Sequence, residues 1–182
     1  MTVRVTYSLV PVVAQPTGVK QNTKFDVILY AKDERPPATY TYNGAKATCP
    51  RGVFAAYLNL AVDPGVLKIN GVEFNSRFPN GRIYKDNGGV FLGAFAGVSL
   101  GGGPVRAEVC RIKLQTLGLY TPDNFTTAVS MNVVGLAKPQ YDTLVYGMDI
   151  NLARELNMPN EISYVDPSEI ALQNLPVTIL GE

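Results

Sequence analysis

The stretch GVFAAYLNLAV at residues 52–62 constrains the fold most, because it carries no charged residue on either face of the strand it predicts. Apolar side chains alternate along it up to the turn Asp63-Pro64-Gly65, and a period of two is typical of a β-strand. The face expected to meet the core consists of Phe54, Ala56, Leu58, Leu60 and Val62. The opposite face consists of Val53, Ala55, Tyr57, Asn59 and Ala61, where a solvent-facing strand normally carries charged residues or threonine.

Two explanations account for an uncharged strand of this kind. Either both of its faces are buried within the chain, for instance beneath residues 33–51, or one face is a flat docking surface for another protein. Exposed apolar patches of several hundred Å² often mark docking surfaces. The segment 90–96 also lacks charge, so both explanations extend to a second strand.

Period-two alternation, β-branched residues and closely spaced turn signals run through most of the chain, which predicts a mostly-β fold. Further strands are expected at 3–9, 25–29, 66–74, 82–85, 90–96, 105–115, 126–134, 143–146, 162–165 and 177–180. Strands at this spacing favour two packed sheets, so the predicted fold class is an all-β sandwich.

Two kinds of segment interrupt this pattern. Residues 33–51 contain three prolines and the pair Asn43-Gly44 between TYTY and AKAT, which predicts a hairpin inserted in a long loop. Short helices are expected at 151–157 and at 167–173. The second follows an N-cap aspartate, a first-turn proline and an acidic third position, which together are a helix start signal.

The overall composition fits a single domain, 1–182, with no polyanionic partner. Hydrophobic residues make up 46% of the chain, and the net charge of +1 gives no electrostatic footprint for nucleic acid or an anionic membrane. No apolar run is long enough to span a bilayer, and the first residues alternate rather than forming a secretion signal. Neither nucleic-acid binding nor membrane insertion is therefore expected.

The chain lacks the residues that most enzymatic mechanisms need. It contains no histidine, the commonest general base and transition-metal ligand, and its carboxylates are scattered among turns. The glycine clusters GGV and LGGGPV lack the Lys-Ser/Thr of a phosphate-binding loop. We therefore expect no catalytic residues, no metal ligands and no cofactor, although turn carboxylates leave calcium open.

Tyrosine and cysteine leave further alternatives open. Ten tyrosines suit a sugar-binding surface, but the absence of tryptophan counts against it. Binding to polysaccharide, or a purely structural role at a cell surface, thus remains an alternative to protein recognition. Cys49 and Cys110 are compatible with one disulfide in an exported protein or with two free thiols.

The strand at 52–62 and the residues after it, GVFAAYLNLAVDPGVLKI, resemble the signature of cohesin domains, in which an alternating apolar strand runs into Asp-Pro-x-x-Leu. The resemblance extends in order through NTKFDVILYAKD, GGVFLGAFAG and RAEVCRIKLQT, and covers most of residues 1–135. It is similar in particular to cohesin-type modules of large bacterial surface proteins. The insertion at 33–51 and the tail after about residue 147 depart from a minimal cohesin.

This resemblance implies a jelly-roll sandwich of about nine strands that acts as a non-catalytic receptor module. The partner it implies is a dockerin-like domain, which is small and helical and carries the calcium itself, in an assembly outside the cell or at its surface. By register from Asp63, the family's binding positions correspond to Ala55, Tyr57 and Asn59. The resemblance implies further binding positions at Tyr84, Leu92 and Ala94, on the predicted strands 82–85 and 90–96. Tyr57 stands where the family commonly has a polar or acidic residue, and we expect it to anchor the partner.

Overall fold

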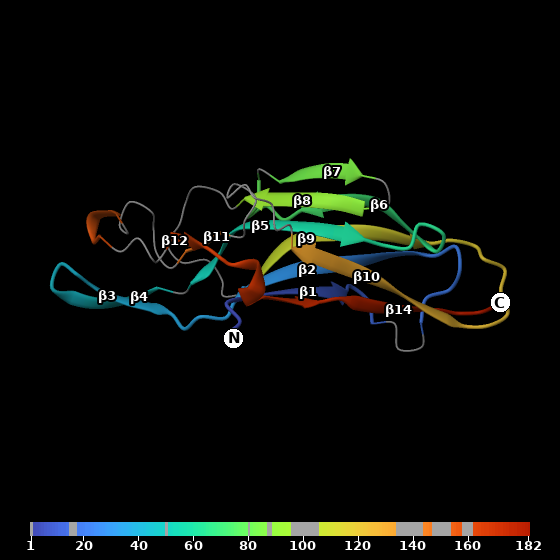
Figure 1. The fold of residues 1–182 in the computed structure, drawn as a ribbon, viewed down its shortest axis with the longest axis horizontal. Helices are drawn as coiled ribbons and strands as arrows, with labels where there is room; N and C mark the ends of the chain where they lie inside the picture. Colours follow the sequence, from blue (N-terminus) through green and yellow to red (C-terminus); the bar gives the residue numbers. More distant parts are fainter. Residues whose placement is uncertain are drawn as a thin grey trace.

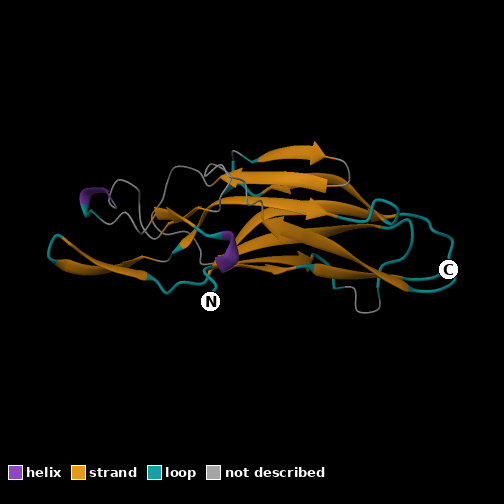
Figure 2. Cartoon of the chain, in the orientation of Figure 1, coloured by secondary structure: helices purple, strands orange, loops and turns teal. Residues whose placement is uncertain are grey.

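The computed structural model describes residues 2–14, 18–49, 51–79, 81–86, 89–95, 106–133, 144–146, 154–157 and 162–182. Within these ranges most of the chain is β-strand, arranged as two packed sheets and a separate hairpin (Figures 1 and 2). The long strands of both sheets have an apolar face, and packing the sheets against one another removes these faces from water. The predicted all-β sandwich is confirmed.

Sheet one has the strand order β13 (Ile170–Gln173), β1 (Val5–Pro11), β2 (Lys24–Asp33), β9 (Arg106–Thr116) and β6 (Leu67–Phe74). Sheet two has the order β7 (Arg82–Asp86), β8 (Gly89–Phe95), β5 (Gly52–Ala61), β10 (Phe125–Val133) and β14 (Leu175–Ile179). The start of β5 also pairs with β11 (Leu144–Tyr146), which pairs in turn with β12 (Ile162–Tyr164). The separate hairpin consists of β3 (Ala38–Tyr42) and β4 (Ala45–Cys49).

The described residues hold fourteen strands, whereas the resemblance to cohesins implied about nine. The hairpin strands, β11 and β12 fall on segments where the sequence predicted a hairpin and short strands, so only β13 lies where no strand was predicted. The helix predicted at 167–173 is wrong beyond its first turn, because a 3₁₀ turn at Pro167–Glu169 leads directly into β13. The start signal itself holds, since Asp166 Oδ1 accepts a hydrogen bond from the Ser168 backbone N–H at 2.8 Å. Residues 170–173 then pair in parallel with β1, and this pairing replaces the helix.

The predicted helix at 151–157 falls largely outside the described residues. Arg154 and Glu155 are helical, and the Asn157 N–H donates to the Arg154 carbonyl at 3.2 Å.

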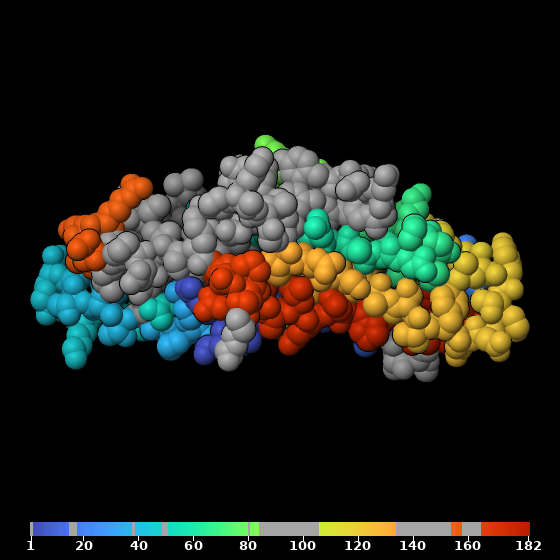
Figure 3. Space-filling view, in the orientation of Figure 1, coloured from blue at the N-terminus to red at the C-terminus, as the bar shows by residue number. Residues whose placement is uncertain are grey.

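The β3–β4 hairpin extends from one end of the sandwich along its long axis (Figures 1 and 3). Its base is held by Asp33, the last residue of β2, whose side chain is 0% exposed. Arg35 donates from Nε to Asp33 Oδ1 at 2.9 Å and from an η nitrogen to Oδ2 at 2.7 Å. On the other side of the hairpin, Arg51 donates to the Pro36 carbonyl at 2.8 Å. Two arginines therefore fix the point where the insertion leaves the sandwich.

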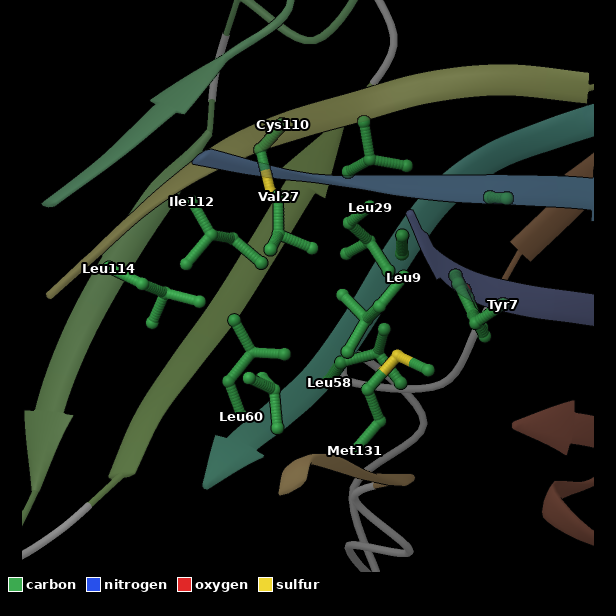
Figure 4. Packing of buried hydrophobic residues seen from close by; sticks show 14 of the residues in the cluster. Tyr7, Leu9, Val27, Leu29, Leu58, Leu60, Cys110, Ile112, Leu114 and Met131 are labelled. Carbon is green, nitrogen blue, oxygen red and sulfur yellow. The ribbon is translucent and has the colours of Figure 1, made fainter. Parts of the chain in front are cut away.

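The core lies between the facing apolar sides of the two sheets (Figure 4). Sheet one contributes Tyr7, Leu9, Val27, Leu29, Cys110, Ile112 and Leu114, and sheet two contributes Leu58, Leu60 and Met131. Burying a side chain of this size contributes about 1.5–3 kcal/mol. Leu58 and Leu60 both belong to this core, which confirms their predicted burial.

Phe54, predicted to belong to the same face, is only half-buried and is not part of the core cluster. The register explains this difference. Leu144 of β11 pairs with Ala55, whereas the next residue, Val145, pairs with Val53, so Phe54 is the extra residue of a β-bulge. The bulge shifts the alternation by one position, and Val53 contributes to the core in place of Phe54.

The chain changes sheets between β13 and β14, and a side chain compensates for the break in pairing. The β10–β14 ladder ends at the pair Val129 and Leu175. Beyond it, the backbone N–H of Met131 donates to Asn174 Oδ1 at 2.8 Å. Asn174, at the corner between the sheets, thus satisfies a donor that would otherwise be buried without a partner.

Candidate functional site

The outer face of sheet one carries charged residues, four of which form cross-strand pairs. Arg111 of β9 lies 3.6 Å from Asp26 of β2, and Lys113 of β9 forms an ion pair with Glu73 of β6. The Lys113 hydrogen bond holds the pKa of Glu73 below its usual value. Such a surface keeps its water, since separating these charges from solvent costs more than their attraction returns.

The outer face of sheet two along β5, β10 and β14 has a different composition. Its partly or fully exposed residues are Asn59, Ala61, Thr126, Ala128, Ser130, Asn132, Pro176 and Thr178, none of which is charged. In Figure 3 the residues of β10 (yellow to orange) and β14 (red) form a continuous strip across the visible face. These eight residues are called the outer strip below. Its side chains are small and uncharged, so covering it avoids the large desolvation cost of a charged group.

Asn59 and Asn132 lie directly opposite one another in the β5–β10 ladder, and both are exposed. On its other side, Asn59 pairs with Phe91 of β8, which pairs with Tyr84 of β7. Positions 84, 91, 59 and 132 therefore follow one another in a single row across β7, β8, β5 and β10. The side chains of Tyr84 and Phe91 lie outside the described part of the structure.

Ala55 and Tyr57 are placed on the predicted side of β5, but they are buried, with exposed fractions of 3% and 5%. Neither belongs to the core cluster between the sheets. The β3–β4 hairpin extends away from the middle of β5 rather than over it (Figure 1). At these two positions burial within the chain explains the missing charge, whereas at Asn59 the uncharged residue is exposed.

The register distinguishes the remaining predicted positions. Leu92 pairs with Leu58, and Ala94 pairs with Ala56. Leu58 and Ala56 both belong to the core cluster, so positions 92 and 94 lie in core-side rows of the sheet. The side chains of Leu92 and Ala94 are themselves outside the described part.

The residues of β10 were not predicted to contribute to a site. The signal for them was present, because Thr126, Ala128, Ser130 and Asn132 alternate with the core-side residues Val129 and Met131. What the sequence alone could not provide was the pairing of β10 with β5, two strands separated by more than sixty residues of chain.

Cys110 carries a free thiol that is buried in the core. Of the two alternatives for Cys49 and Cys110, the disulfide is therefore not the one found in the structure. Burial raises the pKa of Cys110 to about 12, with a smaller contribution from the negative charge of Glu108. The side chain of Cys49 is not among those described.

The described residues show neither a metal cluster nor a sugar-binding platform. No group of three or more His, Cys, Asp or Glu side chains among them could hold a metal ion. The two tyrosines with large exposed fractions in this part are Tyr42 at 39% and Tyr120 at 81%. Tyr42 lies in the hairpin and Tyr120 beside the C-terminal residues, at opposite ends of the molecule (Figure 1). In the same ranges, no helix has the length and apolar character needed to cross a membrane.

No protein-family model and no curated protein sequence matches the chain. Solved structures do match. The seventh ScaB type I cohesin from Pseudobacteroides cellulosolvens has a TM-score of 0.59 at 12% identity, covering 100% of this chain and 95% of that chain. A type I cohesin–dockerin complex from Clostridium thermocellum has a TM-score of 0.56 at 10% identity, covering 99% and 96%. A non-cellulosomal cohesin from the archaeon Archaeoglobus fulgidus has a TM-score of 0.52 at 14% identity, covering 97% and 92%. The two sheets and their nearly complete overlap with these structures show that the chain has the fold of cohesin modules.

Proposed function

We propose that this chain is a non-catalytic recognition module whose outer strip binds a dockerin-like protein domain. The observation that carries the proposal is the contrast between the two outer faces: charged cross-strand pairs on sheet one, and an exposed uncharged strip on sheet two. An interface core is depleted of charged residues, because charges cost free energy when water is removed.

The solved structures support the choice of partner. Several that share this fold are complexes of a cohesin with a dockerin, including those from Clostridium thermocellum and Acetivibrio cellulolyticus. The calcium in such an assembly would belong to the dockerin-like partner. Residues 1–182 would act as one domain, outside the cell or at its surface.

Asn59 and Asn132 take the central role in this proposal. Each amide offers both donors and acceptors, and two adjacent amides on a flat sheet give directional hydrogen bonds to a partner helix. The burial of Tyr57 moves the anchoring role from Tyr57 to Asn59, while Ala55 and Tyr57 support the sheet from within the chain. Arg82, exposed on the edge strand β7, would lie at the polar rim.

Calorimetric titration with a dockerin-like domain in calcium tests the proposal. Each of Asn59→Ala and Asn132→Ala is expected to weaken binding roughly tenfold, the equivalent of about 1.4 kcal/mol. The matched control is Asn70→Ala, which removes an exposed asparagine from β6 on the outer face of sheet one. This variant should bind like the parent.

A chelator separates the roles of the two proteins. Removing calcium should abolish binding through the partner while leaving the thermal midpoint of this chain unchanged. Parental affinity in both outer-strip variants would show that the docking face lies elsewhere. Turnover of a glycoside, ester or peptide that a single carboxylate substitution abolishes would instead establish an enzyme.

A further inference from the structure

The β3–β4 hairpin is a two-stranded sheet whose two outer edges are open with respect to the described strands. Its strands pair with one another and with no other described strand. Asn43 and Gly44, with φ of 48° and 78°, form a two-residue turn of the type that suits a tight hairpin. The ladder therefore begins with a hydrogen-bonded pair at Tyr42 and Ala45, and hydrogen-bonded and non-hydrogen-bonded pairs then alternate along it.

This alternation determines which backbone groups point outward. Thr39 and Thr41 occupy non-hydrogen-bonded positions, so their N–H and C=O groups point to the open edge of β3. Thr48 and Lys46 occupy the matching positions at the open edge of β4. All four residues are exposed.

The two edges differ in how they are protected from other strands. Natural sheets usually block an exposed edge with a charged residue, often lysine, or with proline. The β4 edge has Lys46, whereas β3, with the sequence Ala-Thr-Tyr-Thr-Tyr, has neither. β-branched and aromatic residues without charge are also those that pair most readily in sheets. The open edge of β3 is therefore suited to strand addition.

We propose that β3 pairs antiparallel with β3 of a second copy of this chain, around a two-fold axis at Tyr40. In this register Thr39 of one copy lies opposite Thr41 of the other, and the two Tyr40 residues face each other. The second copy is the occupant that the sequence favours, because the strand is self-complementary in this register: Thr39 meets Thr41, Tyr40 meets Tyr40, and Ala38 meets Tyr42. Thr–Thr and aromatic cross-strand pairs both stabilise sheets, and the strand brings no like charges together.

The position of the hairpin permits this pairing. It lies at one end of the sandwich, away from β10 and β14, so a second copy paired with β3 would not cover the outer strip (Figure 1). The Arg35–Asp33 and Arg51–Pro36 contacts hold its base, which lowers the entropy lost when the two edges pair. The contact is small, and we expect a dissociation constant on the order of 0.1 mM.

Sedimentation of the full chain over a concentration series tests this inference. Thr41→Pro removes an N–H from the open edge of β3 and should weaken self-association at least tenfold. Thr48→Pro makes the same change at the open edge of β4 and is the matched control, which should associate like the parent. Thr41→Lys adds a like charge on each copy beside the axis and should weaken association in a salt-dependent manner.

Three outcomes would overturn the inference. The first is that the parent remains monomeric at a protein concentration ten times the expected dissociation constant. The second is equal association of Thr41→Pro and the parent, and the third is equal loss in Thr41→Pro and Thr48→Pro. None of these residues lies in the outer strip, so the same variants should bind a dockerin-like domain like the parent. Loss of self-association with unchanged dockerin binding therefore tests this inference separately from the proposed function.

Discussion

Arg35 holds Asp33 in a forked ion pair at the base of the hairpin, with N–O distances of 2.9 and 2.7 Å. The Arg35 backbone N–H also donates to the same carboxylate at 3.0 Å. Arg35→Ala should destabilise the fold by about 3–5 kcal/mol, because it leaves a buried carboxylate without its charged partner. Chemical denaturation measures this loss as a lower midpoint.

Lys32→Ala is the control for that measurement. Lys32 and Glu34 also form an ion pair, at 2.7 Å, but both side chains are substantially exposed. Its removal should cost less than about 1 kcal/mol. If the two substitutions lower the unfolding free energy equally, burial does not decide the strength of the Arg35–Asp33 pair.

Leu58 and Phe54 provide a test of the bulge in β5. Leu58 is 1% exposed within the core, so Leu58→Ala should cost about 2–5 kcal/mol, which for a chain of this length corresponds to a fall of roughly 4–20 °C in the thermal midpoint. Phe54→Ala should cost less, because Phe54 lies at the bulge and outside the core cluster. A larger loss for Phe54→Ala would place Phe54 between the sheets and remove the bulge.

Gln21 connects two loops at the C-terminal end of the molecule. Its buried side chain accepts hydrogen bonds from the N–H groups of Leu119 and Tyr120 at 2.7 and 2.9 Å, and donates to Leu180 O at 3.3 Å. Gln21→Ala should cost about 1–3 kcal/mol, since several polar groups lose their partner. The control is Gln115→Ala, which loses one exposed hydrogen bond to Asn70 and should change the unfolding free energy little. Urea titration compares the two.

Cys110 should stay unmodified in the folded protein. Its pKa of about 12 lies above the value near 8.5 that is usual for an exposed thiol. Its contribution to stability is therefore complete below about pH 8.5 and is lost as the pH rises toward 12. Iodoacetamide at about pH 8 should alkylate Cys110 only after denaturation, and peptide mass spectrometry resolves it from Cys49. Rapid alkylation in native buffer would contradict the burial of this thiol.

Much of the fold could be predicted from local patterns. The alternation from Ala56 to Leu60 fixed the core face of β5, and Asn43-Gly44 predicted the hairpin turn, because both signals depend on residues close together in the chain. The predicted helix at 167–173 failed for the opposite reason. Its start signal is local, but parallel pairing with β1, on residues at the far end of the chain, determines the conformation of Ile170–Gln173.

The candidate site divides in the same way. The sequence by itself determined that β5 has an uncharged outward face from Ala55 to Ala61, since a period of two assigns these residues to one side. The bulge at Phe54, which moves Val53 into the core, interrupts that period. Tertiary structure alone decided that Tyr57 is buried, that Asn59 is exposed, and that Asn132 lies opposite Asn59. The physical reason is that burial and cross-strand register depend on which distant strands pair, and the alternation of one strand carries no information about its neighbours.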